Sequence, residues 1–254
     1  MPDDAPRLMH LTSQEAPLAL FCFPPAGMGP LFYYSWAQHT SPDIHLAAIH
    51  LPGRDHHPHP HSPVDTLGLV TQLAHLIHTH TTTPFAFFGH SIGALLAYET
   101  TRHLHTHHQK TPVFLALSGC PAPHLDGLQR NITQAALDGL RTRTDVFPPL
   151  PNETTTLAER VTYCESACAD SVLVLRHHHH DTPPLDTPFG LYCGDTDTFV
   201  SAEDIDRWND LFTEPTNPHF YPGGHRYLPD ANPLVSPQVL KDFTAALRAP
   251  QGRP

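Results

Sequence analysis

The chain has 254 residues, a length at which one α/β domain can reach full size, so we expect a single domain over residues 1–254. Its formal charge is −11 with neutral histidine. A charge balance of this kind excludes a generic attraction to nucleic acid or to an anionic membrane surface. The 23 histidines make the sign depend on pH, because protonating all of them would bring the charge to about +12.

The cysteines and the N-terminal region indicate a soluble cytoplasmic protein. An odd number of cysteines, partly in apolar runs, favours reduced, buried thiols over a disulfide framework. They are Cys22, Cys120, Cys164, Cys168 and Cys193. The first apolar run, residues 18–23, is too short for a signal-peptide core or a membrane span.

Six short apolar runs predict buried parallel strands. They cover residues 18–23, 44–49, 85–88, 113–118, 189–193 and 219–221. Segments with helical spacing lie between them, at 31–39, 65–79, 92–108, 202–213 and 235–247. This alternation predicts a mostly parallel, doubly wound α/β sheet.

The alternation breaks once, between Pro121 and Pro188, where helical stretches occur without a strand-like run. An insertion of this length after a strand is typical of a segment that covers an active site. We therefore expect residues 121–188 to form a helical lid within the domain.

Two histidine-rich segments raise the question of metal binding, because neutral imidazole is a common metal ligand. They are residues 56–61, which contain His56, His57, His59 and His61, and residues 177–180. Such runs in proline-rich loops bind metal opportunistically without making a metalloprotein. We predict no metal ligand and no cofactor.

The nucleophile is predicted from the segment FFGHSIGALLAYE around Ser91. It follows an apolar run and precedes a helical segment, which is the strand, sharp turn and helix context of a nucleophile elbow. Glycine at 89 and 93 tolerates the close backbone approach that such a turn requires. The alternative is an ordinary strand-to-helix turn that happens to hold a serine.

The base and the acid are predicted from chain order, because in this arrangement the acid follows the serine and the histidine comes last. His225, in YPGGHRYL, follows the final strand-like run, whereas His219 lies inside that run. Two carboxylates, Asp195 and Asp197, follow the preceding strand. We favour Asp197, since the first Asp of such a turn often caps the backbone.

The oxyanion hole needs two backbone donors, one of them from the residue after the nucleophile, Ile92. The loop FPPAGMG after the first strand offers the second donor. Pro25 has no N–H, so Ala26 is the better candidate. An ordinary Gly/Pro turn is the alternative.

Together these motifs resemble the type II thioesterases that accompany nonribosomal peptide and polyketide synthases. The matching pieces are FCFPPAG, LPGRD, FFGHSIGALLAYE, SGCPAP, GDTDTFV and PGGHRYL, in the family's order. The resemblance implies an α/β-hydrolase fold, the triad Ser91, Asp197 and His225, and release of acyl groups from the phosphopantetheine arm of an acyl or peptidyl carrier protein. We expect a monomer.

The chain departs from the family pattern at four positions: Pro25, Met28, Cys120 and Cys168. These departures leave room for an atypical acyl group. An esterase, an acyltransferase or a cyclising release enzyme would use the same triad, and a non-catalytic carrier- or metal-binding protein is the rival of another class. Carrier proteins are commonly acidic, so docking would need a local basic patch, which Arg130, Arg141 and Arg143 could provide; the alternative is that they are solvated arginines of the lid helices.

Overall fold

The computed structural model describes residues 5–54, 65–125, 127, 129–134 and 157–248, with side chains left out for 157–161. A seven-stranded sheet forms its centre, in the order β1-β3-β2-β4-β5-β6-β7. The strands are β1 (Arg7–His10), β2 (Leu18–Phe23), β3 (Ile44–His50), β4 (Phe85–His90), β5 (Phe114–Ser118), β6 (Phe189–Gly194) and β7 (His219–Tyr221). All neighbours pair in parallel except β1, which runs antiparallel to β3.

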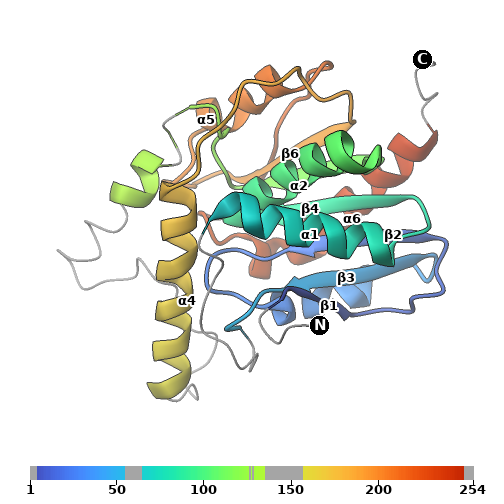
Figure 1. Cartoon of the computed structure of the whole chain (residues 1–254), viewed down its shortest axis with the longest axis horizontal. Helices are drawn as coiled ribbons and strands as arrows, with labels where there is room; N and C mark the ends of the chain where they lie inside the picture. The colour runs from blue at the N-terminus through green and yellow to red at the C-terminus, as the bar shows by residue number, and fades with distance from the viewer. Residues whose placement is uncertain (1–4, 55–64, 126, 128, 135–156, 249–254) are drawn as a thin grey trace.

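Helices cover both faces of this sheet, as the α/β-hydrolase class requires (Figure 1). One face carries α1 (Thr66–His80) and α2 (Ile92–His108), and the other carries η1 (Pro30–His39) and α6 (Leu228–Arg248). The remaining helical elements are α4 (Leu157–Leu175), α5 (Ala202–Asp206) and η2 (Arg207–Leu211). The doubly wound fold predicted from sequence is thereby confirmed.

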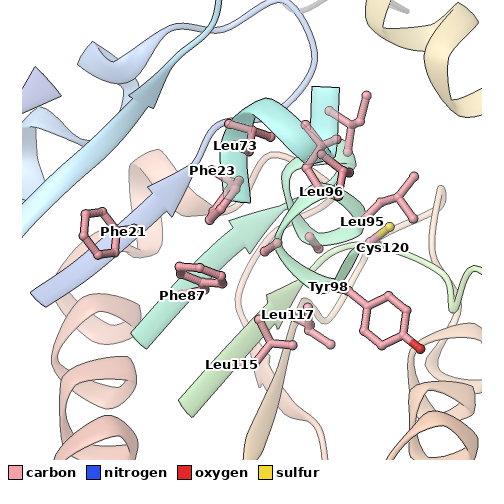
Figure 2. Packing of buried hydrophobic residues seen from close by; sticks show 14 of the residues in the cluster. Phe21, Phe23, Leu73, Phe87, Leu95, Leu96, Tyr98, Leu115, Leu117 and Cys120 are labelled. Carbon is pink, nitrogen blue, oxygen red and sulfur yellow. The ribbon is translucent and has the colours of Figure 1, made fainter. Parts of the chain in front are cut away.

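Alternating side chains of the central strands build two apolar layers, because successive residues of a strand point to opposite faces. Phe21 and Phe23 of β2 pack with Phe87 of β4 under α1 and α2 (Figure 2). Leu20 and Phe88 point to the opposite layer, under η1 and α6. The strands are buried on both faces, which explains why they appear in the sequence as continuous apolar runs.

One strand was missed, and three predicted helices differ from the structure. The strand β1 was not predicted, because RLMH is short and lies half-exposed at the sheet edge. The helix expected over 202–213 is divided into α5 and η2, and the one over 31–39 is a 3-10 helix. The last helix begins at Leu228 and contains Pro233 and Pro237 inside it.

No described helix combines the length and the apolar character needed to cross a membrane. All five cysteines are free, as predicted. The expectation that they are buried is wrong for Cys164 and Cys168, which lie exposed on α4.

Candidate active site

Ser91 lies on a strained turn between β4 and α2. Its φ of 55° and ψ of −126° are outside the regions that side-chain-bearing residues normally occupy. The backbone is crowded on both sides, since a Cβ added at Gly93 would meet Phe23 O at 2.1 Å and one at Gly89 would meet Gly93 O at 2.2 Å. Only glycine fits these two positions, and the turn thereby lifts the Ser91 hydroxyl off the end of the sheet.

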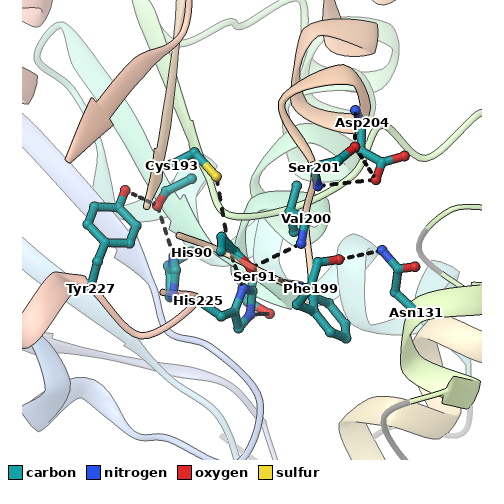
Figure 3. A network of polar contacts seen from close by, with 12 residues as sticks. His90, Ser91, Asn131, Cys193, Phe199, Val200, Ser201, Asp204, His225 and Tyr227 are labelled. Atoms are coloured by element: carbon teal, nitrogen blue, oxygen red, sulfur yellow. Dashed lines mark hydrogen bonds and ion pairs between the residues drawn. The ribbon is translucent and has the colours of Figure 1, made fainter. Parts of the chain in front are cut away.

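His225 reaches Ser91 from the loop after β7 (Figure 3). Its Nε2 lies 3.1 Å from Ser91 Oγ, which is hydrogen-bonding distance. A hydrogen bond from the turn after β6 holds this loop in place: Asp195 Oδ1 accepts from the Gly223 amide at 3.0 Å. Asp195 therefore caps the backbone, as expected for the first carboxylate of this turn. His219 instead stacks on Tyr192, with ring centroids 5.4 Å apart.

Asp197 holds the other side of the His225 ring. Its Oδ2 lies 2.9 Å from His225 Nδ1, and its side chain is completely buried. Its Oδ1 accepts hydrogen bonds from the amides of Phe199 at 2.7 Å and Val200 at 3.0 Å. Burial acts to raise the pKa of Asp197, but His225 and the two amides outweigh it, so the net pKa is lowered. The carboxylate is thus charged at neutral pH.

A second histidine, His90, lies directly behind the first, with ring centroids 5.3 Å apart. Burial first, and then the neighbouring His225, lower the pKa of His90 to about 3. It is therefore neutral at any working pH and adds no positive charge beside His225. Its Nδ1 pairs with Ser118 Oγ at 2.9 Å, and that oxygen pairs with Tyr227 Oη at 2.7 Å.

Tyr227→Phe tests how much this buried chain contributes. Removing the hydroxyl leaves Ser118 Oγ with His90 as its side-chain partner, and we expect the free energy of unfolding to fall by about 1 kcal/mol. Urea denaturation measures this change. A loss above about 3 kcal/mol would mean that the phenol also supports packing that the hydrogen bonds do not describe.

One predicted oxyanion donor belongs to the elbow itself, and the other belongs to the loop that packs on it. Ile92 is the first residue of α2, so its amide has no acceptor within the helix. The loop that carries Ala26 packs on the elbow, since a Cβ at Gly93 would meet Phe23 O and Pro24 O within 2.8 Å. None of the hydrogen bonds found in the described part of the chain uses the Ala26 amide. The neighbouring amides of Ser91 and Gly27 are already bonded, to Ser118 O and to Asp170.

Helix α4 is attached to this loop by a buried carboxylate that the sequence analysis missed. Asp170 accepts a hydrogen bond from the Gly27 amide at 2.9 Å through Oδ2, and its Oδ1 pairs with Arg54. Both side chains are almost fully buried, at 3% and 1% exposure. Gly27 has a φ of 72°, and a Cβ there would meet Tyr163 of α4 at 2.8 Å. The helix thus lies directly against the residue beside Ala26.

Arg54 connects a second loop, the one after β3, to the same helix. Its guanidinium donates to Pro52 O at 2.6 Å and to Ser166 O at 3.5 Å. Ser166 Oγ returns a hydrogen bond to Gly53 O at 2.9 Å. Arg54 occurs in the LPGRD motif, but its partner is 116 residues away in the sequence. No local pattern could have paired them.

The other residues singled out in the sequence are distributed as follows. Cys120 is buried, and its carbonyl accepts a hydrogen bond from Trp208 at 2.7 Å. Arg130 is exposed, whereas Arg141, Arg143 and the histidines of 56–61 lie outside the described residues. The run 177–180 is not a uniform surface segment, because His177 is buried.

A parallel sheet with a serine on a strained strand-to-helix turn and a histidine in the loop after the last strand defines the α/β-hydrolase class. Within that class, the chain belongs to the thioesterase domain family, whose model matches residues 19–247. It is therefore a hydrolase that cleaves thioesters.

Known relatives and solved structures of this class cover most of the chain. Thioesterase PikA5 of Streptomyces venezuelae is 29% identical over 97% of this chain and 88% of its own. Gramicidin S biosynthesis protein GrsT of Aneurinibacillus migulanus is 26% identical over 85% of each chain. The structure of RedJ, a thioesterase from the prodiginine biosynthetic pathway of Streptomyces coelicolor, superposes with a TM-score of 0.75 at 28% identity, covering 91% of this chain and 86% of that one.

Proposed function

We propose that this protein is a type II thioesterase that hydrolyses acyl groups from the phosphopantetheine arm of a carrier protein, with Ser91 as nucleophile, His225 as base and Asp197 as the acid that orients it. The observation that carries the proposal is the continuous path from Asp197 Oδ2 to His225 Nδ1 at 2.9 Å and from His225 Nε2 to Ser91 Oγ at 3.1 Å. This is the geometry of a serine activated by a general base.

The reaction follows from this geometry in two halves. Ser91 Oγ attacks the thioester carbonyl while His225 Nε2 takes its proton, and the amides of Ala26 and Ile92 stabilise the oxyanion. His225 then gives the proton to the departing thiolate. The acyl group remains on Ser91 as an ester, the acyl-enzyme. A water molecule, deprotonated by His225, attacks that ester; the bond to Ser91 Oγ then breaks, His225 returns the proton to Ser91 Oγ, and the free acid is released.

The carrier-bound substrate is supported by the relatives. They include a type II thioesterase from the yersiniabactin NRPS/PKS biosynthetic pathway, 25% identical with a TM-score of 0.77 and covering 94% of this chain. A medium-chain S-acyl fatty acid synthase thioesterase of Homo sapiens is 27% identical over 89% of this chain. The second similarity makes hydrolysis of simple fatty acyl thioesters the alternative function.

Residues 121–188, of which 126, 128 and 135–156 lie outside the described residues, act in this proposal as a lid over the acyl site. The contact of α4 with Gly27, next to the oxyanion donor Ala26, supports that role. The exposed Arg130 belongs to the same segment, and we propose it as a contact for an acidic carrier. The protein would act as a monomer in the cytoplasm.

Mass spectrometry of carrier proteins loaded with a panel of acyl groups tests the proposal. We expect the acyl mass to disappear with the wild-type protein and to persist with Ser91→Ala, while free acid accumulates. Acyl-coenzyme A substrates, assayed in parallel, measure the preference for a carrier. Equal rates on both would favour the fatty acyl alternative, and persistence of every acyl group with the wild type would overturn the carrier-directed thioesterase.

A further inference from the structure

A cluster of three metal-ligating side chains lies away from the serine, between α2 and the segment that follows α4. Glu99 comes from the middle of α2, and His177 and His179 come from the extended segment after Leu175. One donor atom from each of the three side chains lies within 4.8 Å of the other two. His177 Nε2 is 3.3 Å from Glu99 Oε1. From this convergence we propose that Glu99, His177 and His179 bind a divalent transition-metal ion, and that zinc is the ion they fit best.

Unused nitrogen atoms support this proposal independently of the clustering. His177 is 7% exposed, and its Nε2 is buried without a hydrogen bond that satisfies distance and angle, despite its proximity to Glu99. Nδ1 of His179 is likewise buried and has no hydrogen-bond partner in the described part of the chain. Buried imidazole nitrogens are normally satisfied, so these two nitrogens leave donor atoms of the cluster available to a further partner.

The ligand set matches the chemistry of zinc. Two imidazoles and one carboxylate are a recurrent set for this ion, with a fourth position left for water. Ligand atoms around a tetrahedral zinc lie about 3.4 Å apart, so the donor atoms, all within 4.8 Å of one another, need to approach by at most about 1.4 Å.

Arg102 is the competing cation. Its Nη1 contacts both carboxylate oxygens of Glu99, at 3.1 and 3.0 Å, and its Nη2 donates to His180 O at 3.0 Å. Each carboxylate oxygen has two lone pairs, so a metal on Oε1 leaves Oε2 for the guanidinium. The nearby positive charge weakens binding, and we therefore expect a reversible site rather than one required for folding.

At this location the ion would cross-link two segments of the fold. Bound zinc would fasten the segment immediately after α4 to α2, the helix that starts next to Ser91. From the sequence we had predicted no metal ligand, so this site is an addition to that prediction. The sequence could not single out His177 and His179 within a run of four histidines, because Glu99 is distant in the chain.

Zinc binding by the full chain, without an affinity tag, tests the site. Equilibrium dialysis against ZnCl₂ measures stoichiometry, and thermal unfolding with and without ZnCl₂ measures the shift in Tm. Because surface histidines bind zinc adventitiously, every protein compared carries alanine at four positions outside the described residues. These are His56, His57, His59 and His61.

In this background we expect one bound zinc and a higher Tm with ZnCl₂. Glu99→Gln and His179→Gln should each weaken binding at least about tenfold, since even the loss of an outer partner of a ligand costs that much. The matched control replaces the two exposed members of the same run, His178 and His180, with glutamine, and should bind as the background does.

Two outcomes would overturn the site. Either Glu99→Gln and His179→Gln bind zinc as tightly as the background, or the His178 and His180 control loses it, in which case the run binds as a surface chelate. Circular dichroism checks that each variant folds. His179 is only half-buried, so its variant keeps the test informative if Glu99→Gln does not fold.

Discussion

Asp197→Asn is expected to lower kcat/KM by about 1,000- to 10,000-fold while the protein remains folded. The reason lies in the two backbone amides, of Phe199 and Val200, that donate to Oδ1. An asparagine must keep its carbonyl oxygen toward these donors, so its NH₂ group faces His225. His225 Nδ1 must then accept a hydrogen bond, the ring proton moves to Nε2, and the base can no longer take a proton from Ser91.

Asp195→Asn is the matched control, since Asp195 is two residues away in the same turn. Its Oδ1 accepts from Gly223, and an amide oxygen can do the same. We expect its kcat/KM to stay within about tenfold of the wild type, because only a charge on one backbone hydrogen bond is lost. Steady-state kinetics on an acyl thioester compare the two. The reverse ranking of the variants would contradict the assignment of Asp197.

The Arg54–Asp170 pair gives the second large effect. Asp170→Asn should lower the free energy of unfolding by about 3–5 kcal/mol, because it removes the charge of a buried carboxylate that pairs with the buried Arg54 guanidinium. We also expect kcat per folded molecule to fall by about 100-fold, because the single amide oxygen of asparagine cannot accept from both Arg54 and the Gly27 amide, and a shift of Gly27 would move the proposed oxyanion donor Ala26. Denaturant unfolding gives the first quantity, and kcat divided by the fraction labelled by a fluorophosphonate gives the second.

Two further variants separate the effect on stability from the effect on the position of the Gly27 loop. Glu165→Gln removes an exposed carboxylate from the same helix and should change neither quantity appreciably. The double variant Arg54→Met, Asp170→Leu replaces the buried ion pair with apolar groups and should recover much of the stability. Its kcat should stay low, because the Gly27 amide still lacks its acceptor. Recovery of kcat together with stability would reduce the pair to a purely structural role.

The parts of the fold predicted from sequence are those that one local pattern determines. The strands β2 to β7 were found because burial on both faces makes them continuous apolar runs. The strand β1 was missed because an edge strand buries little and pairs through its backbone. The division at Arg207 was missed because side chains around η2, such as Asn209 bonding to Thr216, replace helical bonds by contacts beyond the helix.

The same difference separates the site residues that were predicted from the one that was missed. Ser91, Asp197 and His225 were predicted because strand ends and chain order place them at one edge of a parallel sheet, where the structure brings them together. Their catalytic roles stay predictions. Asp170 was missed, since its two partners come from distant loops, and nothing near ACADS in the sequence distinguishes it from a surface carboxylate.

The attachment of α4 to Gly27 and Arg54 restricts how this enzyme can be re-engineered for other acyl chains. If 121–188 forms the proposed lid, a segment transplanted from a relative in its place would bring a new acyl chamber, but it would function only if it also brought a carboxylate in register with both loops. Chimeras that lack it would lose a buried ion-pair partner of Arg54 and the acceptor of the Gly27 amide together. Exchanging this segment would therefore change substrate range and catalytic rate together. Directed evolution of the proposed chamber should begin with Asp170 and Arg54 held constant.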